Sequence, residues 1–197
     1  MRVFSFVLLV LFVAADQALK LYTVLNLEFQ GETVTVIPGL LAFYYTLNKG
    51  AAWSLFWGQL GFLTALRFTV AVLITLYLLR RSVTGWTRIA FTLIAAGAFG
   101  NAIDGFFRPG VVDMLILWPL TTVYRAIAGS PFPIFNLADV GVVGGALLMI
   151  VLSFVPQKKR LEPGDRLPGL DYDAPAPPAS SAQPPTQPPT VPRSEAE

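Results

Sequence analysis

Long apolar runs separated by short polar segments dominate the first 155 residues. Four runs approach the ~20 residues that a helix needs to cross a bilayer core ~30 Å thick. They cover about 3–24, 60–79, 89–107 and 137–155. The pattern predicts an all-α membrane fold, a four-helix transmembrane bundle.

The segment between the first two runs, about 25–59, has a different period. Glu32-Thr-Val-Thr-Val-Ile alternates polar and apolar residues, the turn signal Pro38-Gly39 follows, and Leu41-Ala-Phe-Tyr-Tyr-Thr-Leu comes next. This order favours a small extracytoplasmic β-sheet. The aromatic residues of this segment would lie at the membrane interface or simply anchor helix ends; they are Phe43, Tyr44, Tyr45, Trp53 and Trp57.

Composition divides the chain into two parts. Overall, 54% of the residues are apolar and only 13% are charged. Yet 11 of the 16 prolines and 11 of the 26 charged residues follow Val155. We therefore expect a membrane domain over 1–155 and a disordered, Pro-rich tail over 156–197.

Basic residues beside the apolar runs predict the orientation. They are Arg2, Arg80, Arg81, Arg88, Lys158, Lys159 and Arg160. With four spans all of them fall on one side, which the positive-inside rule makes cytoplasmic. Both termini are then inside, and 25–59 and 108–136 face outward. The net charge of +2 is too small and too scattered for a nucleic-acid surface.

Small residues recur at helical spacing in the last two runs. Ala96 and Gly100 form one pair, and Gly141 and Gly145 form another. Such pairs permit close approach of two helices. We expect the third and fourth helices to pack together through them.

The chain has no histidine and no cysteine. This excludes catalysis by Ser-His-Asp or Cys-His sites, zinc held by His or Cys, and disulfides.

Before the tail there are six acidic residues, and four are aspartates in or beside apolar runs: Asp16, Asp104, Asp113 and Asp139. Ionisable groups in a bilayer are costly and indicate function by default, although a helix cap or an ion pair also explains a single one.

The predicted orientation gathers these aspartates at the outer membrane face. Asp139 lies near the outer start of the fourth predicted helix, where a carboxylate is favourable at a helix N-terminus. Asp104 and Asp139 each have an asparagine three residues earlier, Asn101 and Asn136, on the same helical face. Two neighbouring carboxylates that share a proton would act as an aspartic protease. A proton path or a magnesium site also uses such aspartates, and spacing does not decide among the three.

Four blocks, in order and spacing, resemble the bacterial lipoprotein signal peptidases (signal peptidase II). They are Asp16-Gln-Ala-Leu-Lys20, Asn48-Lys-Gly-Ala-Ala-Trp-Ser-Leu-Phe56, Gly100-Asn-Ala-Ile-Asp104 with Val111-Val-Asp113, and Phe135-Asn-Leu-Ala-Asp139. The resemblance covers 1–155. It also places the first run in the mature protein, although Arg2, the apolar run and Val13-Ala14-Ala15 imitate a cleaved signal peptide.

The resemblance implies an aspartic endopeptidase, without cofactor or metal, that cuts prolipoproteins before their diacylglyceryl-modified cysteine. Asp113 and Asp139 would be the catalytic pair. Supporting or substrate-binding roles would fall to Asp16, Lys20, Asn48, Asn101, Asp104, Arg108 and Asn136. The family has an arginine directly after the aspartate of the Gly-Asn block, where this chain has Gly105, so Arg108 is the candidate to reach that region.

The expected setting is the bacterial inner membrane, with membrane lipids and the prolipoprotein as partners, globomycin as inhibitor and the enzyme as a monomer. Two rival functions remain at this stage. One is a proton-coupled transporter that uses the aspartates as a relay, and the other is a magnesium-dependent lipid phosphotransferase.

Overall fold

The computed structural model describes residues 2–50, 58–83 and 85–155. The predicted disordered tail, Trp53, Trp57 and the second half of the Asn48 block lie outside these residues.

Four long helices occupy the predicted apolar runs. They are α1 (Arg2–Asn26), α2 (Leu60–Arg80), α3 (Gly85–Phe107) and α5 (Leu137–Ser153). Within the described residues, α1, α2 and α3 are long and apolar enough to cross a membrane, whereas α5 has 17 residues and is shorter. Large apolar side chains such as Leu11, Leu73 and Val151 are exposed on the helix surfaces.

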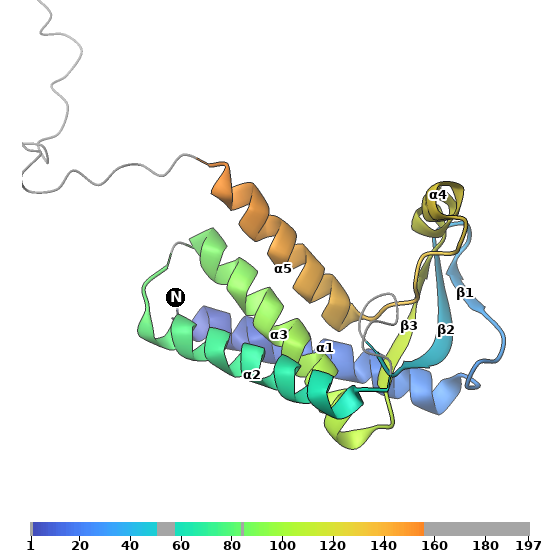
Figure 1. Ribbon diagram of the computed structural model, residues 1–197, viewed down its shortest axis with the longest axis horizontal. Coiled ribbons are helices and arrows are strands. Elements are labelled where there is room, and N and C mark those ends of the chain that lie inside the picture. Colours follow the sequence, from blue (N-terminus) through green and yellow to red (C-terminus); the bar gives the residue numbers. More distant parts are fainter. Residues whose placement is uncertain (1, 51–57, 84, 156–197) are drawn as a thin grey trace, which may run out of the picture. The chain divides into compact units, whose positions relative to one another are not determined.

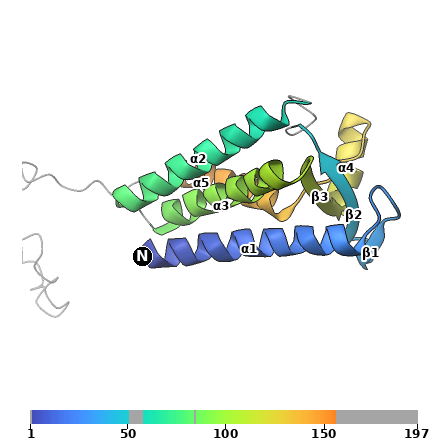
Figure 2. The same cartoon turned by 90° about the horizontal axis from the view of Figure 1, so that it is seen from below.

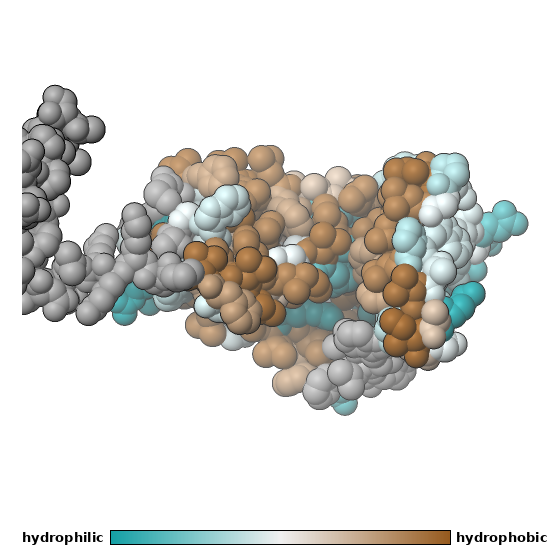
Figure 3. Space-filling view, turned by 90° about the horizontal axis from the view of Figure 1, so that it is seen from above, coloured by the Kyte–Doolittle hydropathy of each residue, from teal (hydrophilic) through white to brown (hydrophobic). Residues whose placement is uncertain are grey.

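Within residues 2–155 the long helices lie side by side, with the sheet at one end of the bundle (Figures 1 and 2). Figures 1 and 2 show the starts of α1 and α3 and the ends of α2 and α5 at one end, and the sheet at the other. Helix α3 packs against α1, α2 and α5. On the face drawn in Figure 3, apolar residues cover most of the helical part, and hydrophilic residues show in a hollow before the sheet.

Small residues let α3 and α5 approach closely, which confirms that prediction for three of the four residues named. A Cβ atom added to Gly100 would lie 3.1 Å from the Ala138 Cβ. One added to Gly141 would lie 3.0 Å from the Leu93 carbonyl oxygen. One added to Gly145 would lie 2.6 Å from the Ala90 carbonyl oxygen. Backbone therefore meets backbone along this interface.

The outer segment forms an antiparallel sheet of three strands in the order β1-β2-β3. Strands β1 (Val34–Ile37) and β2 (Leu41–Asn48) confirm the prediction from alternation. Strand β3 (Val111–Leu117) and the short helix α4 (Trp118–Ala128) were not predicted. The run Val-Val-Asp-Met-Leu-Ile-Leu does not alternate, because most of β3 is buried on both faces.

Two adjacent glycines of α5 provide a test of this packing. Gly145→Ala should lower the free energy of unfolding by about 1–3 kcal/mol, because the new methyl group must displace the α3 backbone. Gly144→Ala is the matched control: a Cβ there meets nothing within 4 Å, and it should stabilise the helix by about 0.5–1 kcal/mol. Thermal unfolding in detergent measures both. Equal melting temperatures would contradict the close contact between α3 and α5.

Candidate active site

Helix α5 begins with a reciprocal cap that fixes Asp139. The Asn136 Oδ1 atom accepts a hydrogen bond from the Asp139 backbone N–H at 2.9 Å. The Asn136 backbone N–H donates to Asp139 Oδ2 at 3.2 Å. Together they form a capping box. The expectation that Asp139 sits at a helix N-terminus is confirmed, and its carboxylate has a defined direction.

Strand β3 places Asp113 beside this cap. Phe135 pairs with Leu115 of β3, with Leu115 N–H donating to the Phe135 carbonyl at 2.7 Å. The following residue, Asn136, then donates from Nδ2 to Asp113 Oδ1 at 2.6 Å. On the neighbouring strand β2, Asn48 donates from Nδ2 to Asp113 Oδ2 at 3.1 Å. Asp113 is only 2% exposed.

Burial first, and then the charge of Asp139, raise the pKa of Asp113 to about 7, while the hydrogen bonds from Asn48 and Asn136 oppose the rise. A buried carboxyl next to another carboxylate therefore keeps its proton up to near-neutral pH. Asp139 is only partly buried. The two carboxyl groups thus differ in environment, as an acid and a base must.

Asn101 connects Asp139 to the rest of the polar network. Its Nδ2 atom donates to Asp139 Oδ1 at 2.8 Å, and its Oδ1 atom accepts from Asn136 Nδ2 at 3.0 Å. Asn101 therefore orients the aspartate of α5 and not Asp104 of its own helix, because Asp104 is held by two cations and a backbone N–H.

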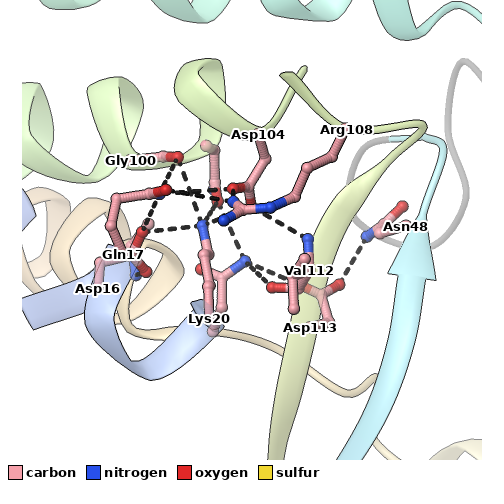
Figure 4. A network of polar contacts seen from close by, with 12 residues as sticks. Asp16, Gln17, Lys20, Asn48, Gly100, Asp104, Arg108, Val112 and Asp113 are labelled. Atoms are coloured by element: carbon pink, nitrogen blue, oxygen red, sulfur yellow. Dashed lines mark hydrogen bonds and ion pairs between the residues drawn. The ribbon is translucent and has the colours of Figure 1, made fainter. Parts of the chain in front are cut away.

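A second group of buried charges lies next to Asp113 (Figure 4). Lys20 Nζ lies 2.9 Å from Asp16 Oδ2 and 2.9 Å from Asp104 Oδ2, with all three side chains fully buried. Lys20 also donates to Asn101 Oδ1 at 3.0 Å. The charges and amides predicted from sequence therefore form one continuous network around Asp113 and Asp139.

Arg108 is part of this network. It forms an ion pair with Asp104 Oδ1 and donates to Gln17 Oε1 at 3.2 Å. Gln17 in turn donates to Asp16 Oδ2 at 3.1 Å. Sequence reasoning did not single out Gln17, although it lies within the Asp16 block. Its polar side chain inside an apolar run was the available signal.

Gly105 is required by packing against α2. A Cβ atom at this position would overlap the Thr64 hydroxyl, so a larger residue does not fit without movement of α2. Thr64 itself is buried and donates to the Leu60 carbonyl at 2.7 Å. The departure from the family pattern at Gly105 thus accompanies a close contact between α3 and α2.

Sequence reasoning gave Arg67 no functional role. In the structure it donates from Nη2 to the Gly50 carbonyl at 3.2 Å. Gly50 N–H donates to Asn48 Oδ1 at 2.9 Å, so Arg67 supports the turn that carries Asn48. A cation inside an apolar run indicated that Arg67 needs a buried partner, but the sequence did not show that this partner is Gly50, 17 residues earlier.

The chemistry available to these residues is proton transfer between carboxyl groups and water. The amides of Asn48, Asn101 and Asn136 orient both carboxyls. Within the described part of the chain, no three acidic side chains come together in a way that would hold a metal ion.

Known proteins resemble this chain over most of its length. A family model described as signal peptidase (SPase) II matches residues 8–155. The lipoprotein signal peptidase of Deinococcus radiodurans is 42% identical over 157 residues, 80% of this chain and 82% of that protein. That of Microcystis aeruginosa is 38% identical over 147 residues, 74% and 88% of the two chains.

A solved structure described as a bacterial membrane enzyme superimposes with a TM-score of 0.66 and 26% identity, covering 80% of this chain and 94% of the other. The match of the family model extends from α1 to the end of α5 and so includes every residue of the network described above. The chain belongs to the signal peptidase II family.

Proposed function

We propose that this protein is a membrane aspartic endopeptidase that removes signal peptides from diacylglyceryl-modified prolipoproteins, cleaving before the lipidated cysteine. Membership of the signal peptidase II family supports this activity. The observation that carries the assignment is the shared contact of Asn136, which donates to Asp113 from its side chain and to Asp139 from its backbone. One residue thus holds two carboxyl groups of different burial side by side.

In this mechanism Asp139 is the base and Asp113 holds the shared proton. Asp139 takes a proton from a water molecule, whose oxygen forms a bond to the scissile carbonyl carbon. Asp113 transfers its proton to the carbonyl oxygen. When the C–N bond breaks, Asp139 returns its proton to the leaving nitrogen, and Asp113 recovers a proton as the carbonyl re-forms. General acid–base catalysis of this kind contributes ~10²–10⁴-fold in rate.

The supporting residues have separate tasks in this proposal. Asn48, Asn101 and Asn136 orient the two carboxyls through the contacts given above. The outer sheet would hold the peptide, while the acyl chains of the substrate remain in the bilayer among membrane lipids. The side chain of Arg108 is 23% exposed and is paired with Asp104, and it is the supporting cation that we assign to the substrate.

The membrane arrangement follows from the helices. The apolar lengths of α1, α2 and α3 indicate a membrane protein. We propose that α5 is the fourth span, that 1–155 is the membrane domain, and that both chain ends are cytoplasmic in the bacterial inner membrane. At 1.5 Å per residue the 17 residues of α5 span about 25 Å, somewhat less than the ~30 Å of a bilayer core. The proposed enzyme is a monomer.

The rival functions are weaker. The proton-coupled transporter and the magnesium-dependent lipid phosphotransferase have no support from the family match. Activity that survives a chelator and yields a peptide product would separate the proposed peptidase from both.

Replacing either carboxyl of the pair should abolish cleavage. Asp113→Asn and Asp139→Asn each remove a group that must gain and lose a proton, so we expect a loss of at least ~10²-fold. Cleavage of a synthetic diacylglyceryl-modified precursor, followed by mass spectrometry, measures this. The exposed acid Glu32, changed to Gln, is the matched control and should cleave normally.

Globomycin should block the wild-type reaction, as the resemblance to the family implies. Normal cleavage by Asp113→Asn or Asp139→Asn would refute the catalytic assignment. Absence of cleavage by the wild-type enzyme would refute the proposed function itself.

The proton on Asp113 predicts an alkaline limit to activity. With a pKa of about 7, raised by burial and by Asp139, Asp113 is protonated below neutral pH and loses its proton above it. We expect kcat/KM, which reports the pKa values of the free enzyme, to fall about tenfold per pH unit above that value. Returning the enzyme from high to neutral pH should restore the rate, which separates titration from unfolding. A rate that rises between pH ~7 and ~8 would contradict this assignment.

The same proton should appear in the stability of the protein. Between pH ~4 and ~7 the folded protein holds a proton on Asp113 that the unfolded chain releases, so rising pH destabilises the fold by up to ~1.4 kcal/mol per unit. Asp113→Asn removes this contribution. Its melting temperature should therefore change less over this range than that of the wild type. Parallel curves would show that Asp113 does not carry the proton.

A further inference from the structure

Two buried aspartates outside the proposed catalytic pair make the same kind of contact. Asp16 Oδ1 accepts a hydrogen bond from the Ala138 backbone N–H at 2.8 Å. Asp104 Oδ2 accepts one from the Val112 backbone N–H at 3.0 Å. Ala138 directly precedes Asp139, and Val112 directly precedes Asp113. We call these two contacts the backbone clamps, because each fixes the main chain next to one carboxyl of the pair.

Lys20 joins the two clamps. Its ammonium lies 2.9 Å from Asp16 and 2.9 Å from Asp104, and Lys20 is 0% exposed. Figure 4 shows its side chain reaching toward these two carboxylates. A single buried cation thus ties the backbone at the start of α5 to the backbone at the start of β3.

The ammonium also sets the direction of an amide, besides donating to the Gly100 carbonyl oxygen at 3.4 Å. Lys20 donates to Asn101 Oδ1 at 3.0 Å, and an ammonium has only donors. The oxygen of Asn101 must therefore face Lys20, which turns its Nδ2 toward Asp139 Oδ1 at 2.8 Å. Lys20 acts on Asp139 through this amide as well as through the backbone.

The charges around Lys20 are balanced. Asp16 and Asp104 contribute two negative charges, and Lys20 and Arg108 contribute two positive ones, all joined by ion pairs. Removing Lys20 alone would leave an unpaired buried negative charge, which is strongly destabilising. A test must therefore separate the loss of charge balance from the loss of the link.

We propose that Lys20 is a positioning residue that sets the placement of Asp113 relative to Asp139 by linking the two backbone clamps and orienting Asn101. This rests on the proposed function, since it assigns Lys20 a task in that reaction. Lys20 itself touches neither carboxyl of the pair among the contacts that the described residues make. A displacement of about 1 Å between reacting groups costs as much as ~10²-fold in rate.

The double variant Asp16→Asn/Lys20→Met removes the ammonium that links the two backbone clamps and orients Asn101, and it preserves the balance of buried charge. The amide oxygen that replaces Asp16 Oδ1 still accepts from Ala138, Asp104 still accepts from Val112, and the charges of Asp104 and Arg108 still balance. The protein should fold with a melting temperature near that of the wild type. Its kcat on the lipidated precursor should fall ~10²-fold, while KM changes by less than about threefold.

Lys20→Met and Arg88→Met complete the comparison. Lys20→Met should lose both stability and kcat, because its site also carries an unpaired charge. Arg88 is a second buried cation, in α3, and donates to the Leu78 and Arg81 carbonyls far from the site. Arg88→Met should lower stability and leave kcat per folded enzyme unchanged.

Wild-type kcat in the double variant would overturn the proposal, since Lys20 would then only balance charge. A kcat that falls only in proportion to the folded fraction would also overturn it. Either outcome is decisive only if the wild-type enzyme cleaves the precursor and the Asp139→Asn variant does not. If the wild type itself fails to cleave, the proposed function falls first, so the two failures are distinguishable.

Discussion

Burying a carboxylate in an apolar helix bundle requires a partner for each of its oxygens, and this constraint organises the polar part of the molecule. Asp16 and Asp104 meet it with Lys20, Arg108 and backbone N–H groups. Asp113 meets it with two amide donors. The partners come from α1, β2, β3, the start of α5 and Arg108 just after α3, so satisfying the carboxylates fixes how these elements meet.

The packing of α3 and α5 serves the same network. Because glycines let the helix backbones touch, Asn101 in α3 reaches Asp139 in α5 directly. Wider separation by ordinary side chains would open a gap that an asparagine does not span. The apolar contact and the polar contact are thus two consequences of one close approach.

Much of this arrangement was predictable from local signals in the sequence. Apolar length predicted the helices, alternation predicted β1 and β2, glycine spacing predicted the contact of α3 with α5, and Asp139 was expected at a helix start. Local signals failed for β3, which is buried on both faces and does not alternate. They also failed for the partners of Asn101 and Arg67, which depend on residues distant along the chain. The choice of Asp113 over Asp104 for the catalytic pair came from resemblance to the family.

Asn136 has two roles, which use both its side chain and its backbone N–H. It ends the extended segment and starts α5, and it also bonds to Asp113 and constrains Asp139. The contacts that form the first turn of this helix are thus also contacts that bring the carboxyl pair together. A chain whose last helix has not formed therefore lacks the proposed catalytic centre.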